Sequence, residues 1–251
     1  MEQLTLTAFL NRLFGPAVTS LLEALHVHPK HPATPITNPV AMEILVVLLL
    51  TLLFIAIRLR LSVERPGALQ HTMEGINGFI GNLAHEIIGH HSDRFVPYLT
   101  ALGLFILTCN LLGIIPGLES PTAVPPVPLG CALVTWFYYH YSGLRENGAW
   151  GYLQHFIGPQ EGMPMAVRII LPAPFFLIEV FSHTARILSL TVRLFANMFA
   201  GEMVTLVFFS LLPLGLPIIF EGLHIFVSFI QTYIFVLLAT VYLGEAVAHE
   251  H

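Results

Sequence analysis

Polar and charged side chains recur inside one long apolar stretch of the sequence, residues 174–212. They are, in chain order, Glu179, Ser182, His183, Arg186, Ser189, Arg193, Asn197 and Glu202. A helix turns about 100° per residue, so six of these residues, Arg193 included, lie within roughly 40° of one direction. Glu202 then points to the opposite face. The pattern predicts a polar stripe along a helix that is otherwise suited to lipid.

The following apolar stretch, residues 218–243, also carries polar groups. They are Glu221, His224, Ser228 and Gln231. His224 and Gln231 are seven residues apart, so they share one helix face. We interpret the serines of both stretches mainly as groups that join helices by hydrogen bonds. The titratable residues are candidates for moving an ion, because ionisable side chains inside a membrane usually mark an ion pathway.

Arg193 is the residue that packing explains least well. An arginine at the centre of a spanning helix costs at least about 2.5–3.5 kcal/mol on insertion scales, and its guanidinium stays protonated. The acids on its own helix, Glu202 and Glu179, lie about 13 and 21 Å away along the axis. At a similar depth, the neighbouring stretches offer only Gln231 and Asn110. We therefore expect the counter-charge to be a carboxylate of another chain.

The same arrangement predicts two separate inlets for an ion. One inlet, reaching from the outer side to mid-membrane, contains Glu202 and His224. The other, reaching from the cytoplasmic side, contains Glu179, Ser182 and Ser189. The fixed charge of Arg193 between them repels a cation, so each inlet is expected to be a half-channel. A carrier must then move the ion from one to the other, and a full crossing releases about 2.3 kcal/mol per charge at 100 mV.

The whole composition is that of a membrane protein. Of 251 residues, 55% are hydrophobic and 10% are charged, whereas a soluble domain has about 25% charged residues; the mean hydropathy is +0.78. The net charge of −5 is thinly spread, which gives no reason to expect a nucleic-acid partner. We predict an all-α polytopic fold, with an N-terminal external segment over 1–40 and a membrane domain over 41–251.

About five spanning helices are expected, at 41–59, 95–115, 128–142, 174–212 and 218–243. Residues 3–25 are predicted to form a short amphipathic helix, 26–39 an exposed His- and Pro-rich segment, 70–92 an interfacial helix, and 143–171 a polar loop. At 1.5 Å per residue the helix over 174–212 would be about 58 Å long, while the hydrocarbon core is about 30 Å thick. The last two helices are therefore expected to be long and steeply tilted.

Arginine placement predicts the orientation of the chain. With five spans, one side of the membrane receives Arg58, Arg60, Arg65, Arg94, Arg145 and Arg168, and the other receives Arg12 and Lys30. Cytoplasmic loops carry the excess of basic residues. The N-terminus is therefore expected outside and the C-terminus in the cytoplasm.

Three segments carry a resemblance to a known family. SLTVRLFANMFAGE (189–202) resembles the signature of subunit a of the F-type ATP synthase, the proton-channel stator subunit of its membrane sector. HIFVSFIQTYIFVLLATVYL (224–243) resembles the C-terminal helix of that family, and LTCNLLGIIPG (107–117) fits its middle region. The resemblance covers about residues 40–251.

The resemblance implies a non-catalytic stator subunit in a bacterial inner membrane, with the c-subunit ring, the peripheral-stalk b subunits and the remaining ATP synthase subunits as partners. Arg193 would face the ring carboxylate. Glu202, His224 and Gln231 would line the outer half-channel, with Asn197 near the arginine. Glu179, Ser182, Arg186 and Ser189 would lie on the cytoplasmic side. The expected ion is a proton, and no cofactor, metal or catalytic residue is implied. The sequence contains no P-loop for ATP.

Two other functions are compatible with parts of the pattern. A haem- or quinone-binding anchor of a redox complex could use His140, His183 or His224, which lie in or near predicted spans. A secondary transporter would usually show internal repeats and broken helices, which the sequence lacks. A Soret absorption band would favour the first alternative, and co-purification with a ring of small hairpin subunits would exclude the second.

Overall fold

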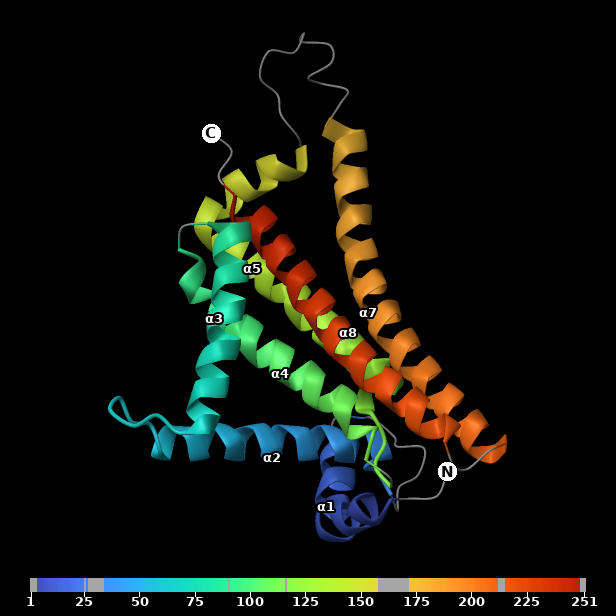
Figure 1. Ribbon diagram of the computed structural model, residues 1–251. Coiled ribbons are helices and arrows are strands. Elements are labelled where there is room, and N and C mark those ends of the chain that lie inside the picture. Colours follow the sequence, from blue (N-terminus) through green and yellow to red (C-terminus); the bar gives the residue numbers. More distant parts are fainter. Residues whose placement is uncertain are drawn as a thin grey trace. The chain divides into compact units, whose positions relative to one another are not determined.

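The computed structural model describes residues 4–24, 26, 34–89, 91–115, 117–157, 172–211 and 215–248. Over these residues the regular structure is entirely helical (Figure 1), which confirms the all-α prediction. The α-helices are α1 (Thr5–Ala24), α2 (Asn38–Leu59), α3 (Ala68–Ile88), α4 (Val96–Leu112), α5 (Pro126–Ile157), α7 (Pro172–Leu211) and α8 (Leu216–Val247). Two short 3-10 helices are η1 (Ser92–Arg94) and η2 (Pro121–Ala123).

Three of the described helices are long and apolar enough to cross a membrane: Asn38–Leu59, Pro172–Leu211 and Pro217–Val247. The helix Val96–Leu112 is apolar but shorter. The ranges predicted for spans coincide with α2, α4, α7 and α8 or, for 128–142, lie inside α5. Their depth in a bilayer stays a prediction. The helix α7 has 40 residues, which corresponds to about 60 Å.

The helix expected over about 70–92 is present as α3. It ends at Ile88, because Gly89 and His91 adopt positive φ angles of 82° and 69° that a right-handed helix excludes. One sequence prediction about local structure is wrong. The polar loop expected from residue 143 is helical as far as Ile157, with a kink at Gly148 where φ is 69°. Residues 27–33 of the His- and Pro-rich segment, which include Lys30, and residues 158–171, which include Arg168, lie outside the described residues.

The chain divides into two compact units. The first comprises Met1–Gln70, Leu104–Val124 and Ala196–Ile230. Its core joins α1, α2 and the end of α4 through a cluster of buried apolar residues: Leu10, Ile36, Ala41, Met42, Val46, Cys109 and Leu112. The Asn11 side chain donates to the Ile36 carbonyl and accepts from the Ile36 N–H, both at 2.9 Å. These two bonds tie the segment before α2 to α1.

The second unit comprises His71–Gly103, Pro125–Phe195 and Gln231–His251. Tyr98 of α4 stacks on Tyr138 of α5 with ring centroids 4.0 Å apart, and its hydroxyl lies 3.0 Å from Thr135 Oγ1. Arg94 forms an ion pair with Glu146 at 2.8 Å. One aromatic contact and two polar contacts therefore join Arg94 and Tyr98 to α5.

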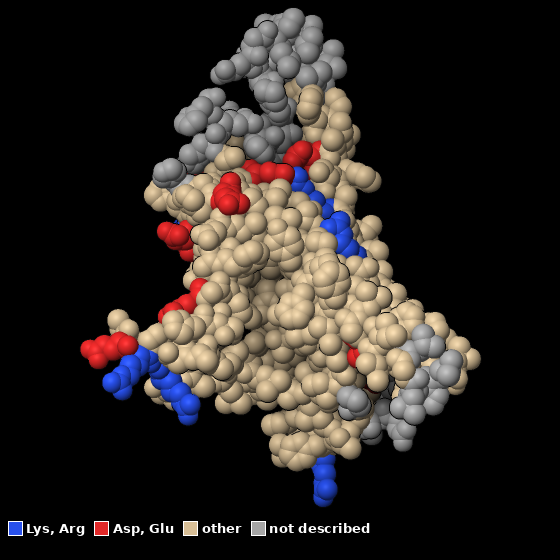
Figure 2. Space-filling model, in the orientation of Figure 1, with Lys and Arg blue, Asp and Glu red and all other residues tan. Residues whose placement is uncertain are grey.

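Much of the protein surface is apolar, as expected for lipid contact. On the face that Figure 2 shows, charged side chains occupy small patches and most of the surface carries none. On α7, Phe181, Leu188 and Val192 are 76%, 64% and 50% exposed. Their spacing of seven and four residues places them on one side of the helix, which we call the α7 apolar stripe.

Candidate ion-translocation site

Arg193 lies in the part of α7 that belongs to the second unit, and it is partly buried. Its Nη2 donates a hydrogen bond to Ser189 Oγ, one helical turn earlier, at 3.3 Å. Among the described residues of that unit, the ion pairs join other groups and none includes Arg193. A guanidinium that bonds to a serine hydroxyl, and belongs to none of these ion pairs, can still meet a carboxylate of another chain, and that counter-charge stays a prediction.

Glu202 of α7 is held by the loop that follows α4. The Ser120 backbone N–H donates to Glu202 Oε1 at 3.1 Å. Ser120 Oγ donates to the Cys109 carbonyl at 3.0 Å and lies 2.7 Å from Thr122 Oγ1. Thr122 Oγ1 in turn donates to Asn110 Oδ1 at 2.6 Å. A buried chain of hydrogen bonds therefore connects the Glu202 carboxylate to α4 within the first unit.

Gly113 makes this position of Glu202 possible. A Cβ atom at Gly113 would lie 2.9 Å from Glu202 Oε1, 2.8 Å from Ser120 Cβ and 3.2 Å from the Ser120 nitrogen. Two of these separations are shorter than any that real Cβ atoms show. Only glycine therefore allows the carboxylate and the loop to approach α4 this closely.

His224 faces a different space from Glu202. A cavity of about 300 Å³ between α7 and α8 is lined by Asn197, Ala200, Gly201, Val204, Phe220, Leu223, His224 and Val227. The His224 ring lies 3.4 Å from the point where a Gly201 Cβ would be. Its Nε2 is buried and has no hydrogen-bond partner among the described residues. This places the His224 ring beside a cavity large enough to hold water.

The sequence placed Glu202 and His224 in one pocket, and the structure separates their surroundings. Asn197 and Gly201 are four residues apart and face the cavity, so the next residue, Glu202, is rotated by about 100° from it. Its carboxylate instead meets the Ser120 N–H. Sequence reasoning missed Ser120 and Thr122, for which the only signal was two hydroxyl residues beside the prolines of the 116–128 segment.

The residues predicted on the cytoplasmic side lie in the second unit. Arg186 Nη2 forms an ion pair with Glu245 Oε2 at 2.7 Å, and its guanidinium lies 4.6 Å from the Tyr242 ring centroid. Glu179 Oε1 lies 3.2 Å from His183 Nε2. Ser182 is partly buried and Ser189 is exposed. The sequence pattern gave no signal for Glu245, whose carboxylate on α8 compensates the charge of Arg186.

Gln231 is also in the second unit, where its side chain is buried on α8 with 2% exposure. His140 and His183, considered above as haem ligands, pack with their ring centroids 4.7 Å apart. His140 Nδ1 lies 2.6 Å from the Tyr152 hydroxyl. The kink at Gly148 permits this contact, since twelve residues of straight helix would separate the two by about 18 Å. Burial raises the pKa of Tyr152 to about 12, so its hydroxyl stays neutral at physiological pH.

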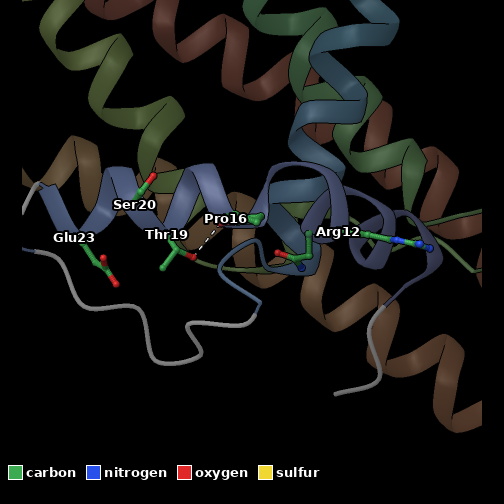
Figure 3. Close-up of a pocket in the computed structure, with 7 residues that line it drawn as sticks. Arg12, Pro16, Thr19, Ser20 and Glu23 are labelled. Carbon is green, nitrogen blue, oxygen red and sulfur yellow. Dashed lines mark hydrogen bonds between the residues drawn. The ribbon is translucent and has the colours of Figure 1, made fainter.

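A second cavity lies along α1 and is unrelated to these residues. It has a volume of about 490 Å³ and is lined by α1 side chains that include Arg12, Thr19 and Glu23 (Figure 3). Thr19 donates its hydroxyl hydrogen to the Gly15 carbonyl at 3.0 Å, as the close-up shows. The cavity follows one face of a single helix, and none of the predicted site residues lines it.

The fold and the site together define a multi-pass membrane protein whose two longest apolar helices carry charged and titratable side chains. The chain belongs to the ATP synthase A chain family, whose model matches residues 40–244. It is 59% identical over 250 residues to "ATP synthase subunit a" of Koribacter versatilis (strain Ellin345), covering 100% of this chain and 99% of that protein. This membership confirms the resemblance seen in the sequence.

Two further relatives carry the same name. The chain is 50% identical over 219 residues to "ATP synthase subunit a" of Solibacter usitatus (strain Ellin6076), covering 87% of this chain and 91% of that protein. It is 42% identical over 196 residues to the protein of that name from Aquifex aeolicus (strain VF5), covering 74% and 86%. Membership in this family relates the chain to proton transport and ATP synthesis in a membrane rather than to haem binding.

Proposed function

We propose that this chain is the non-catalytic stator subunit of a rotary ATP synthase and that it passes protons through two offset half-channels. The observation that carries the proposal is Arg193, a partly buried arginine on an apolar helix, bonded to Ser189. Its fixed charge separates the inlets and attracts a carboxylate carried past it by a ring of c subunits. Catalysis of ATP synthesis belongs to other subunits.

The outer half-channel contains Glu202, His224, Asn197 and Gln231. Water in the cavity beside His224 and Asn197 brings protons from the outer side towards mid-membrane. Glu202 lies outside that cavity, held by the Ser120 N–H, and is a second proton-exchanging group of the outer half-channel. Asn197 and Gln231 are polar groups near the arginine that hydrogen-bond to water without carrying charge.

The inner half-channel contains Glu179, Ser182, Arg186 and Ser189 on the cytoplasmic side. The Arg186–Glu245 ion pair keeps the inlet polar with little net charge. The chain crosses the inner membrane of a bacterium several times, with its N-terminus outside and its C-terminus in the cytoplasm. Its partners are the c-ring, the b subunits of the peripheral stalk and the other ATP synthase subunits.

The test is Arg193→Ala in the complete ATP synthase, measured as ATP-driven proton pumping in inverted membrane vesicles. Pumping should fall to the background level because the two inlets are no longer separated by a fixed charge. Arg145→Ala is the matched control, since Arg145 is an exposed arginine of α5 outside both inlets. Normal pumping by Arg193→Ala, with normal assembly, would show the proposed function to be wrong.

A further inference from the structure

His183 has a defined place in the second unit but no role in the two half-channels described so far. It lies one turn after Glu179 on α7 and is 7% exposed. Its Nδ1 is 2.8 Å from the Tyr139 hydroxyl, and its Nε2 is 3.2 Å from Glu179 Oε1. Each ring nitrogen therefore faces a group that exchanges protons or hydrogen bonds.

The ring of His183 is held in this orientation from α5. The Tyr139 side chain is 1% exposed and stacks against the imidazole, with centroids 5.6 Å apart and planes 28° apart. His140 packs on the imidazole at 4.7 Å between centroids. Rotation of the His183 ring would break the contact with Tyr139 and move Nε2 away from Glu179. The aromatic cluster thus fixes which nitrogen faces the acid.

The three groups form a line from the buried interior to the surface. Tyr139 is fully buried, His183 is almost so, and the Glu179 side chain is 31% exposed. Imidazole suits such a position, because its ring nitrogens bind and release protons. In the protonated ring, Nδ1–H points at the Tyr139 oxygen and Nε2–H at Glu179. Transfer of the Nε2 proton to the Glu179 carboxylate leaves a neutral imidazole and a carboxylic acid, and Glu179 then passes that proton to water; the same steps in reverse protonate the imidazole again.

We propose that His183, oriented by Tyr139, exchanges protons with Glu179 and is a working residue of the cytoplasmic half-channel. This inference rests on the proposed function and adds a residue to it. The other titratable and charged groups around His183 are Arg186 on its own helix, His140 and Tyr152 on α5, and Tyr242 and Glu245 on α8. Arg186 is paired with Glu245 and His140 with Tyr152, which leaves Glu179 as the acid facing His183.

The experiment measures passive proton flux through the membrane sector in inverted vesicles from which the soluble catalytic part has been removed. A potassium diffusion potential drives the flux, and the pH outside the vesicles, which is the cytoplasmic side, is varied while the inside is buffered. His183→Gln keeps a hydrogen-bonding group of similar size but cannot titrate. Flux should fall by at least about tenfold, a modest loss for an acid–base group.

The pH profile separates proton exchange from simple packing. Flux through the unaltered protein should vary with outside pH, and His183→Gln should lose that variation. Tyr139→Phe keeps the ring and removes the hydroxyl. It should reduce the dependence of the flux on outside pH, as His183→Gln does, but to a smaller extent. The matched control is His71→Gln, because exposed His71 also faces a glutamate one turn away, with Nδ1 3.8 Å from Glu74 Oε2.

Three results would overturn the inference. The first is an unchanged flux and pH profile in His183→Gln. The second is a flux that His183→Gln lowers by the same factor at every outside pH, and the third is a flux through the unaltered protein that varies with inside pH and not with outside pH. If His183→Gln fails to assemble, the Tyr139→Phe profile decides by the same criteria. Arg193→Ala, measured alongside as ATP-driven proton pumping in the complete enzyme, tests the proposed function separately: abolished pumping there with a normal His183→Gln profile removes only the role of His183.

Discussion

Ser120→Pro removes the backbone N–H whose hydrogen bond positions Glu202. Proline has no N–H, and its ring fixes φ near −65°, while Ser120 already has a φ of −72° and a ψ of 118°. The φ and ψ angles of Ser120 therefore suit a proline. The substitution also deletes the Ser120 hydroxyl, so Ser120→Ala is the matched control, which loses the hydroxyl bonds to Cys109 and Thr122 but keeps the N–H.

The size of the effect follows from the bond that is lost. A hydrogen bond to a charged group contributes about 1.5–3 kcal/mol. Each 1.4 kcal/mol or so changes a population tenfold, so the observed placement of the Glu202 carboxylate would be about ten- to a hundredfold less populated. Proton uptake from the outer side should fall by a similar factor in Ser120→Pro, because the acid is no longer held where protons arrive.

The assay is passive proton flux in the same inverted vesicles, with the inside, which is the outer face, made acidic. Ser120→Pro should lose most of the flux and Ser120→Ala should retain most of it. Equal losses in the two variants would mean that the hydroxyl network, and not the N–H, holds Glu202. Normal flux in Ser120→Pro with normal assembly would refute the assignment of Glu202 to a fixed position.

Two further changes test the same geometry. Gly113→Ala should cost about 1–3 kcal/mol of stability through overpacking, because its Cβ would contact Glu202 Oε1 and Ser120. The thermal unfolding temperature of the purified complex should fall, and proton uptake should be impaired. Gly130→Ala, with open space around it, should change neither. Glu202→Gln should impair uptake from the outer side more than Glu179→Gln does in proton-flux measurements, and comparable losses would contradict the order of importance given to the two acids.

The helices of this chain were predictable because their sequence signal is local. Apolar runs of the right length gave α2, α7 and α8, and the 40-residue length of α7 followed from the absence of proline between residues 175 and 212. The residues at which the helices end were harder to predict. The end of α3 depends on the positive φ angles of Gly89 and His91, and the extension of α5 depends on contacts made after the kink at Gly148.

The partners of the polar residues were not predictable, since they are distant in sequence. Ser120 meets Glu202 across 82 positions, and Tyr139 meets His183 across 44. Helical periodicity tells which residues share a face of one helix, but it carries no information about the loop or helix that the face meets. The single strongest inference, Arg193 without an acid in reach on its own helix, needed only the rise per residue.

Under the proposed function, in which the chain works beside a turning ring, the α7 apolar stripe would have a mechanical consequence. Dispersion attraction between carbon atoms is weak for each pair and has no preferred direction. A neighbour that slides along Phe181, Leu188 and Val192 breaks no hydrogen bond and exchanges one methyl contact for another of nearly equal energy. If the proposed ring contacts this stripe, the stripe would resist sliding only weakly, and the charge of Arg193 would supply the specific attraction between the two parts.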